Sequence, residues 1–429
     1  MARKNITNPG EFEDVSSYSS SKEYKKRKKN RRGRAVLRGI AIFFCLIFIL
    51  CGSGLVYVST NLLSGLTTTS IAKDDDSLGI DPTNIVMDDN IKNIALFGVD
   101  SRNGNFEGLS DVIMVLTVDN KHGKIKMTSI LRDSEVLIEG DSYSQGYLSY
   151  TDKINVAYRY GGPELTIRTL NRNFGLDIRD YVTINFANMA TIVDAFGGVD
   201  IELTAEEVGA INDNLWALSQ EVEDQKELDM QNGTYENQTY AEITSEDYIP
   251  TINGDINIMY GEYEGGMYRL NGNQAVAYGR IRYIDSDYKR VERQQTVFSA
   301  LIGKLEGMGM GDYTNLIQQL MPYCETSLDL TDIMGMTPIL FTDFSISSIS
   351  VPNAEYETDL FDNNDSSGVY HMIYDPTNAG KRISSFIYEE DSPYWSEYGD
   401  TSKKDADTAS ASSASGDTSS GDESTGLEG

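Results

Sequence analysis

The sequence predicts a layered α/β domain on the outer side of a membrane, preceded by one N-terminal transmembrane helix. Residues 39–58 carry no charge over twenty positions, which is long enough for a helix to cross about 30 Å of hydrocarbon. Strand-type apolar runs alternate with helical patterns from residue 93 to residue 203, an order typical of layered α/β domains. Roughly 310 residues lie between a stalk and a low-complexity tail, which suffices for one large domain.

The flanks of the apolar run predict its orientation. Ten Lys or Arg residues lie between Lys22 and Arg38, whereas none follows the run until Lys73. This bias leaves residues 1–38 in the cytoplasm and exports the rest of the chain. A cleaved signal peptide is the alternative, but its apolar core would be shorter and a small-x-small site would follow. A lipoprotein anchor at Cys51 is disfavoured by bulky Leu50. We therefore expect an uncleaved signal anchor in the cell membrane, with an extracytoplasmic C-terminal domain.

The other segments differ by composition. Residues 1–38 are basic and polar, and we expect a disordered cytoplasmic tail that also contacts anionic lipid. Residues 59–90 are expected to form a stalk, and residues 401–429 a disordered Ser- and Asp-rich tail. Residues 306–400 are expected to form a C-terminal extension that packs on the domain. Residues 206–266 are acidic and weakly periodic, which predicts a surface insertion.

The exported part of the chain is strongly acidic. Of 36 Lys and Arg and 66 Asp and Glu residues, only 12 basic and 4 acidic ones lie within residues 1–38. Nucleic acid is therefore not expected as a partner, because phosphate backbones need a broad basic surface. Cys324 is the only cysteine beyond the membrane run, so the outer domain has no disulfide. With His122 and His371 as the only histidines, we expect a hard, oxygen-ligated metal rather than zinc.

Three apolar runs open the domain, at residues 93–99, 111–119 and 124–131. If these strands run up, down and up, Asp100, Asp111 and the Arg132-Asp133 pair meet at one edge of the sheet. Two carboxylates at such an edge could share Mg²⁺, which takes oxygen ligands and commonly keeps waters and phosphate oxygens. The alternative is that these side chains make loop caps and surface ion pairs.

The next elements are a helix, a strand, a second helix and a strand. The Gly161-Gly162-Pro163 sequence predicts a helix that begins at Pro163 and ends at Gly175. A strand over residues 181–186, a short helix over 189–195 and a strand over 199–203 follow. Their apolar side chains form either an ordinary core or a groove for a long hydrocarbon chain, and the two readings stay open: Leu165, Ile167, Leu170, Phe174, Val182, Ile184, Phe186, Ile192 and Phe196.

Residues 278–295 concentrate five basic side chains in this acidic chain. A strand over residues 270–283 is expected to place Arg280 and Arg282 on one face. A helix over residues 288–305 is expected to place Arg290, Arg293, Gln294 and Val297 on one face. Because arginine forks match phosphate oxygens, we interpret this as a clamp around a diphosphate. The alternative is a set of ion pairs with Asp285 and Asp287.

Several ordered motifs resemble the LytR-CpsA-Psr family. The motifs are FGVDSR at residues 97–102, SDVIMVLTVD at 110–119, SILRD at 129–133, KINVAYRYGG at 153–162, the VTINF to VDAFGGVDI run at 182–201, and LNGNQAVAYGRIRYIDSDYKRVERQQ at 270–295. The resemblance covers roughly residues 91–305. It implies a mixed central β-sheet sandwiched between helices, with a hydrophobic tunnel for a polyprenyl chain.

The family resemblance also implies site residues. Asp100 and Asp111 would bind Mg²⁺, with Mn²⁺ as a substitute. The diphosphate would meet Arg132, Arg280, Arg282 and Arg290, with Arg293, Gln294 and Arg102 in support, and with Lys153 and Asn155 in a neighbouring loop. Asp133 or a metal-bound Asp would be the base. Leu131, Ser134 and Val112 depart from the residues common in the family, but no charged group is lost.

The implied function is transfer of a glycopolymer, such as teichoic acid or capsule, from an undecaprenyl diphosphate carrier to a peptidoglycan hydroxyl. It would take place at the outer membrane face of a Gram-positive type bacterium. Two alternatives remain open. One is a polyprenyl diphosphate phosphatase that uses water as acceptor, and the other is a non-catalytic lipid-binding regulator of envelope assembly.

Overall fold

The computed structural model describes residues 67–399 and 401, apart from 84, 100–105, 107, 236–239, 241, 257–260, 283, 307, 309–311, 313, 314, 317, 318, 366 and 367. The predicted cytoplasmic tail, the predicted anchor at 39–58 and residues 402–429 lie outside this part. Within the described residues, no helix combines the length and apolar character needed to cross a membrane.

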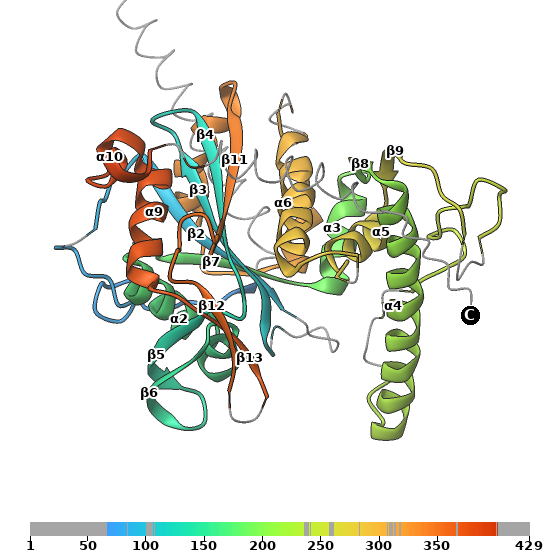
Figure 1. Cartoon of the computed structure of the whole chain (residues 1–429), viewed down its shortest axis with the longest axis horizontal. Helices are drawn as coiled ribbons and strands as arrows, with labels where there is room; N and C mark the ends of the chain where they lie inside the picture. Colours follow the sequence, from blue (N-terminus) through green and yellow to red (C-terminus); the bar gives the residue numbers. More distant parts are fainter. Residues whose placement is uncertain are drawn as a thin grey trace, which may run out of the picture. The chain divides into compact units, whose positions relative to one another are not determined.

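The centre of the domain is a mixed seven-stranded sheet of order β1-β10-β7-β2-β3-β4-β11 (Figure 1). Its strands are β1 (Thr67–Thr68), β2 (Ile91–Val99), β3 (Ser110–Asp119), β4 (Lys124–Ile130), β7 (Asp180–Asn185), β10 (Glu325–Thr326) and β11 (Ser345–Val351). As expected, β2, β3 and β4 form an antiparallel series. β7 is parallel to β2 and β11 is parallel to β4, which makes the sheet mixed.

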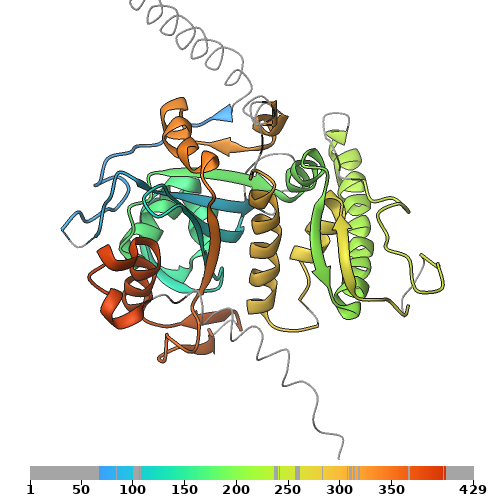
Figure 2. The same cartoon turned by 90° about the horizontal axis from the view of Figure 1, so that it is seen from above.

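Helices cover both faces of the sheet, so the predicted layered α/β fold is confirmed. On one face lie α2 (Asn155–Phe174) and α9 (Pro376–Tyr388), and on the other α3 (Phe186–Ala195), α5 (Gly272–Gly279) and α6 (Asp287–Gly303) (Figure 2). The alternation along β2 matches this arrangement. Ala95, Phe97 and Val99 join the core under α2 and α9, whereas Leu96 and Gly98 line a pocket on the other face.

The sequence prediction for α2 is correct from Pro163 onward but misses its first segment. The helix already begins at Asn155, and the non-helical dihedrals of Gly161 and Gly162 interrupt it. Gly162 has φ +59°, and a Cβ there would lie 2.0 Å from the hydroxyl of Tyr143. The glycine pair therefore allows a kink under the hairpin of β5 (Glu135–Ser142) and β6 (Gly146–Lys153).

The segment at residues 206–266, which was predicted to be a surface insertion, begins with a regular helix that the sequence analysis did not predict. Residues 205–232 form the long helix α4 (Ala205–Asn232), which a Thr204–Glu207 capping box starts and Gly233 ends. Val208, Ile211 and Leu215 are fully buried in a second core beside β8 (Val199–Leu203) and β9 (Gly266–Leu270). The two strands pair with each other and not with the central sheet.

The expected strand over residues 270–283 is also wrong. Asn271 and Gln274 form a capping box that starts α5, so this stretch is a helix followed by a loop. Arg280 is the C-cap of α5, and strand alternation does not place Arg280 and Arg282 on one face. The following helix is confirmed as α6, which begins after the Ser286 cap.

Residues 327–388 complete the domain with α8 (Leu330–Met336), β11, α9 and a hairpin of β12 (Phe361–Asn364) and β13 (Tyr370–Ile373). The two hairpins β5–β6 and β12–β13 extend from the same end of the central sheet (Figure 1). A bridge between Ser134 and Met372 joins their bases.

Candidate active site

Three strand ends meet at one edge of the central sheet. Val99, the last residue of β2, is paired with Ser110 at the start of β3 and with Asn185 at the end of β7. Asp111 follows Ser110 directly. Asp100 and Arg102, which were predicted to act here, lie outside the described residues.

The structure brings Asp111, Arg132, Asp133 and Lys153 together at this edge. The Nη1 of Arg132 donates to Oδ1 of Asp111 over 2.8 Å, and its Nε donates to Asp133 over 3.2 Å. The ammonium of Lys153 binds the other oxygen of Asp133 at 3.0 Å. Burial opposes the charge of Arg132, but Asp111 and Asp133 outweigh this effect and raise the pKa of Arg132.

Arg290 is the least satisfied cation of this group. Its side chain is 6% exposed, and its Nη1 lies 3.2 Å from Oδ1 of Asp287. That contact is not in hydrogen-bond geometry, so Nε and Nη1 of Arg290 have no hydrogen-bond acceptor among the described residues. Burial, and then repulsion from Arg132, lower the pKa of Arg290 to about 10. The half-exposed Arg282 lies 4.0 Å from the same Asp287.

The two other predicted arginines have carboxylate partners from α4. Arg293 is buried and binds Glu207 over 2.9 Å, and it also binds Asp285. Arg280 binds Glu221 over 3.0 Å, and its guanidinium lies over the ring of Phe186 at 5.4 Å. The arginines of residues 278–295 thus have different surroundings. Arg282 and Arg290 lie near Arg132, whereas Arg293 binds Asp285 in the loop before α6.

Several buried polar atoms near the strand ends lack a partner within the described part of the chain. They are Oγ of Ser110, Oδ1 of Asn155 and Nδ2 of Asn185. Asn155 was predicted as a site residue, and its backbone N–H donates to the carbonyl of Arg132. Ser110 and Asn185 were not predicted. The sequence indicated these two residues only by their position, Ser110 at the start of a predicted strand and Asn185 near the end of another.

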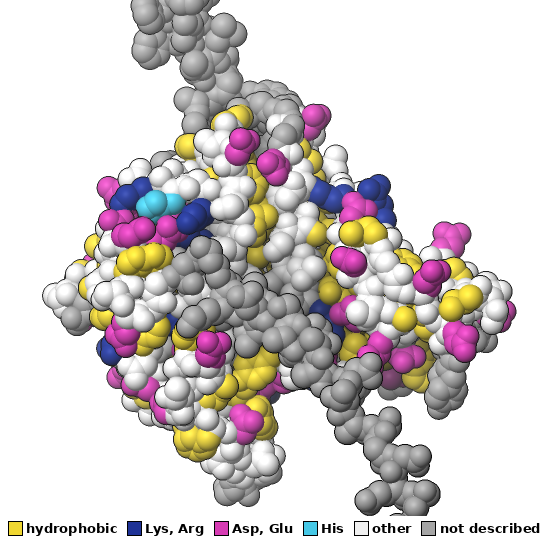
Figure 3. Space-filling model, turned by 45° about the horizontal axis from the view of Figure 1, so that its top comes forward, with side chains coloured by type: hydrophobic (Ala, Val, Ile, Leu, Met, Phe, Trp, Pro, Cys, Tyr) yellow, Lys and Arg dark blue, Asp and Glu magenta, His cyan; other side chains and the backbone are white. Residues whose placement is uncertain are grey.

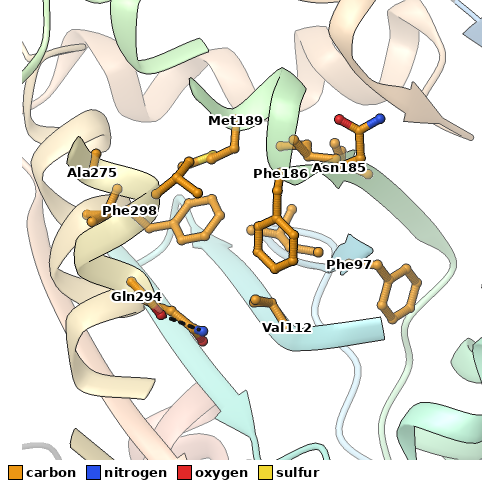
Figure 4. Close-up of a pocket in the computed structure, with 15 residues that line it drawn as sticks. Phe97, Val112, Asn185, Phe186, Met189, Ala275, Gln294 and Phe298 are labelled. Carbon is orange, nitrogen blue, oxygen red and sulfur yellow. Dashed lines mark hydrogen bonds between the residues drawn. The ribbon is translucent and has the colours of Figure 1, made fainter. Parts of the chain in front are cut away.

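An apolar pocket lies between the sheet and helices α3, α5 and α6. Its volume is about 610 Å³, including open solvent at its mouth. The rings of Phe186 and Phe298 point into the cavity (Figure 4). The pocket is lined by Leu96, Phe97, Gly98, Val112, Val182, Ile184, Asn185, Phe186, Met189, Ala275, Val276, Gly279, Gln294, Val297 and Phe298.

The apolar residues that were predicted to form a core or a groove divide between the two faces of the sheet. Val182, Ile184 and Phe186 line it. Leu165, Ile167, Leu170 and Phe174 belong instead to the core on the opposite face of the sheet.

One end of the pocket adjoins the charged edge. Gln294 lines the pocket one helical turn after Arg290 and thus on the same side of α6, whereas Val112 lines it from the face of β3 opposite to Asp111. Gln294 also donates to the carbonyl of Gly279 over 3.2 Å, which ties α6 to α5. The arrangement suits an amphiphile with an apolar chain and an anionic head.

The donor atoms at this edge fit a hard cation. Oδ1 of Asp111 binds Arg132, and the preceding residue Ser110 has a hydroxyl without a hydrogen-bond partner among the described residues. Mg²⁺ commonly uses one or two carboxylates together with water and phosphate oxygens. Within the described residues, the group of three ligand side chains closest to a metal-binding geometry is elsewhere: Asp119, His122 and Glu389. Lys126 already pairs with both carboxylates there, at 2.8 Å each.

Basic side chains are not gathered over the visible surface. On the face drawn in Figure 3, Lys and Arg side chains lie in small groups among Asp and Glu. The exclusion of nucleic acid stays a prediction from composition.

The chain is similar to several known proteins. A sequence model of the LytR_cpsA_psr family matches residues 55–382. The polyisoprenyl-teichoic acid–peptidoglycan teichoic acid transferase TagT of Bacillus subtilis (strain 168) is 26% identical over 344 residues, which cover 77% of this chain and 90% of TagT. The TagU transferase of Halalkalibacterium halodurans is 33% identical over 211 residues, which cover 49% of this chain and 51% of TagU. The crystal structure of protein gbs0355 from Streptococcus agalactiae has a TM-score of 0.50 at 20% identity, with 70% of this chain and 87% of that chain covered, and shows the same fold.

Proposed function

The chain belongs to the LytR-CpsA-Psr family, and from that premise we propose that it is a membrane-anchored glycopolymer phosphotransferase. It transfers a glycopolymer from an undecaprenyl diphosphate carrier to a hydroxyl of peptidoglycan outside the cell. The names of the relatives TagT and TagU, which describe teichoic acid transferases to peptidoglycan, support this substrate class. The uncharged run at 39–58 and the basic residues before it support an anchored protein with an exported domain.

The observation that carries the proposal is the junction between the apolar pocket and Arg290. Nε and Nη1 of this buried guanidinium lack a hydrogen-bond acceptor among the described residues, which costs about 1–3 kcal/mol for each unsatisfied polar group. A diphosphate oxygen would satisfy these donors with a charge-assisted bond. The hydrocarbon chain of the same lipid would fill the adjoining pocket.

In the proposed reaction, the arginines stabilise the charge that grows on the leaving phosphate. The acceptor oxygen forms a bond to the phosphorus that carries the glycopolymer. The bond from this phosphorus to the bridging oxygen breaks, and polyprenyl monophosphate leaves. Arg132 and Arg290 bind the phosphate oxygens, with Arg282 beside them and Arg280 at the pocket wall. Fixed forks of this kind need no reorganisation as the charge moves.

Asp133 is the proposed base for the acceptor proton. Arg132 and Lys153 hold one oxygen each, so the carboxylate has a fixed orientation. Lys153 acts through Asp133 and is a positioning residue. Arg293 likewise acts through Asp285 and fixes the loop that carries Arg282.

Asp111, with Asp100 from the preceding FGVDSR motif, would hold Mg²⁺ or Mn²⁺. The cation would supply positive charge to the diphosphate oxygens. Asp111 also orients Arg132 through the 2.8 Å bond, so it serves the arginine group directly.

The test uses the full-length protein in detergent, a short-chain polyprenyl diphosphate sugar, Mg²⁺ and peptidoglycan oligosaccharide. Lipid monophosphate release coupled to a phosphodiester-linked oligosaccharide supports the proposal. Release that is equally fast without oligosaccharide, with no adduct when it is present, would indicate a diphosphatase and contradict the transferase. Tight lipid binding with no turnover would indicate a lipid-binding regulator.

A further inference from the structure

One aromatic ring belongs both to the apolar pocket and to the group of arginines. Phe186 lines the pocket, and its ring extends from the start of α3 into the cavity (Figure 4). The guanidinium of Arg280 lies over the same ring, with its central carbon 5.4 Å from the ring centre. The ring of Phe186 therefore borders the space for the lipid chain and also lies under a cation that the proposed function assigns to the diphosphate.

Two closely packed helices fix the positions of this ring and this cation. Phe186 is the first residue of α3, and Arg280 is the C-cap of α5. At the start of α5, the N–H of Gly272 donates to Oδ1 of Asp194 over 2.7 Å. A Cβ on Gly272 would lie 2.0 Å from the carbonyl oxygen of Ala190, so the close approach of the two helices requires glycine. The packing of α3 on α5 therefore holds Phe186 and Arg280 in a fixed relation.

The ends of the two helices have restraints of their own. Oδ1 of Asn185 accepts a backbone N–H of α3 over 2.8 Å, which caps the helix directly before Phe186. Nε2 of Gln294 donates to the carbonyl of Gly279, directly before Arg280. The ring and the guanidinium are thus carried by backbone that is fixed on both sides of their contact.

The contact with the ring restrains Arg280 without using its hydrogen-bond donors. A guanidinium over an aromatic face is attracted by the ring quadrupole, while its N–H groups point outward in its own plane. Nη1 and Nη2 of Arg280 donate to the carboxylate of Glu221, which is partly exposed on α4. A diphosphate that takes the place of this carboxylate would meet a guanidinium that the ring of Phe186 already orients.

We propose that Phe186 is a positioning residue that links the two ends of the lipid substrate: its ring contacts the hydrocarbon chain and orients Arg280 toward the diphosphate. The identity of the lipid rests on the proposed function. A chain packed in the pocket adds contacts to the cavity side of the ring and restricts its motion, and the restricted ring in turn holds the guanidinium. Phe298, whose ring also points into the pocket, contacts the chain alone.

Inorganic pyrophosphate tests the contribution to the head group without a lipid chain. It is titrated with Mg²⁺ into the full-length protein in detergent and followed by calorimetry. Phe186→Leu keeps an apolar side chain but removes the aromatic face, so pyrophosphate should bind about twofold to fivefold more weakly. Phe186→Tyr keeps the face and should bind pyrophosphate like the wild type. Phe298→Leu is the matched control, because it removes a ring of the same pocket and should leave pyrophosphate affinity unchanged.

A double-mutant cycle shows whether the effect of Phe186 passes through Arg280. In the Arg280→Ala background, Phe186→Leu is expected to cause no further loss of pyrophosphate affinity. An equal loss in both backgrounds, or unchanged binding by Phe186→Leu alone, overturns the proposal. An equal loss in Phe186→Leu and Phe186→Tyr, or no binding by the wild type at millimolar pyrophosphate, overturns it as well. Circular dichroism confirms that each variant is folded.

A fifteen-carbon prenyl diphosphate tests the contact with the chain. Phe186→Leu should lose more affinity for this ligand than for pyrophosphate, because the ring then acts on both ends of the molecule. Equal losses for the two ligands would overturn the link between chain and head group. Phe298→Leu should lose affinity for the prenyl diphosphate only.

The transfer assay separates this role from the proposed function. Phe186→Leu is expected to lower kcat at saturating lipid, because Arg280 is then less well placed on the leaving phosphate. If the wild type transfers nothing but Phe186→Leu weakens pyrophosphate binding through Arg280, the proposed function fails and the positioning role stands. If the wild type transfers the glycopolymer and Phe186→Leu keeps its kcat and its pyrophosphate affinity, the positioning role fails and the function stands.

Discussion

The guanidinium of Arg280 binds the carboxylate of Glu221, 59 residues earlier in the chain, with N–O distances of 3.0 and 3.3 Å. This contact belongs to a series along α4. Glu207 binds Arg293, Asn214 donates to the carbonyl of Ala277, and Glu221 binds Arg280. The three residues are seven apart and therefore share one face of the helix. The helix thus supports the segment that carries the arginines.

Glu221 is expected to restrain the affinity for the lipid diphosphate. Glu221→Gln keeps a hydrogen-bond acceptor for Arg280 but removes a negative charge beside the anionic head. A partly exposed pair of this kind contributes about 0.2–1 kcal/mol, so affinity should rise by roughly 1.4-fold to fivefold. Binding of a short-chain polyprenyl diphosphate measures the effect. Glu206→Gln, an exposed residue on the same helix, should change affinity less, and equal changes in both variants would contradict the local role.

Arg132 is expected to be essential for transfer. Arg132→Ala removes a preorganised donor from the leaving phosphate, which typically lowers kcat by about 10² to 10³. Arg132→Lys should recover only part of this loss, because an ammonium cannot reproduce the planar fork. Lipid monophosphate release measures kcat, and circular dichroism checks the fold. Full activity of Arg132→Ala would exclude the proposed mechanism.

Arg290→Met is expected to stabilise the empty protein and to abolish diphosphate binding. The variant removes a buried charge whose Nε and Nη1 lack a hydrogen-bond acceptor among the described residues, so the free energy of unfolding should rise by about 1–2 kcal/mol. Urea titration at pH 8 measures this gain. Arg282→Met, at a half-exposed site, should change stability by less than about 0.5 kcal/mol.

The gain from Arg290→Met should also depend on pH. Because the pKa of Arg290 is lowered from 12.5 to about 10, the folded state binds this proton less tightly than the unfolded state. The penalty in the wild type is fully present below pH 10 and decreases as the pH rises from 10 toward 12.5. The stability difference between variant and wild type should therefore shrink above pH 10. A constant difference would refute the linkage.

Removal of divalent cations is expected to stop transfer. EDTA should abolish lipid monophosphate release, and Mg²⁺ or Mn²⁺ should restore it, whereas Zn²⁺ should not. Asp111→Asn should need at least tenfold more Mg²⁺ for half-maximal activity. Asp141→Asn, an exposed carboxylate on the β5–β6 hairpin, is the control. Full activity of the wild type in EDTA would rule out the cation.

Filling the pocket is expected to act on the lipid chain alone. Val276→Phe adds volume to a wall residue that is 9% exposed. The variant should raise KM for a long-chain polyprenyl diphosphate about tenfold or more and should affect a five-carbon prenyl analogue much less. Equal losses for both chain lengths would instead indicate a distorted head-group site.

The antiparallel strands β2, β3 and β4 and the charged residues at their ends could be predicted, because the residues that determine them are close in sequence. Three apolar runs with short connections form an antiparallel series, and this places Asp111 near Arg132 without further information. The helix α6 was also predictable from its periodicity. The stretch before it was not, because short apolar runs fit a strand or a helix equally well. In the structure, the Asn271–Gln274 capping box stabilises the start of the helix α5 in this stretch.

The division of the arginines could not be predicted from the stretch that contains them. Glu207 and Glu221 lie on α4, whose three buried apolar residues are obscured by acidic residues on its other faces. The pocket could not be predicted from the sequence either. Val182 lines it and Ile167 packs in the core on the opposite face of the sheet, but both are ordinary apolar residues in the sequence. Only the three-dimensional structure shows that Val182 and Ile167 lie on opposite sides of the sheet.

The place of the pocket between the sheet and its helices bears on the last step of the cycle. Substrate and product of the proposed reaction carry the same hydrocarbon chain, so bond cleavage removes contacts of the head group and none of the tail. The hydrocarbon chain keeps its contacts with the pocket after cleavage, so the spent carrier must still withdraw its tail before a loaded carrier can enter. Escape of the used lipid into the bilayer would then govern turnover. The recycling of carrier lipid and the pace of wall growth would be coupled at this cavity.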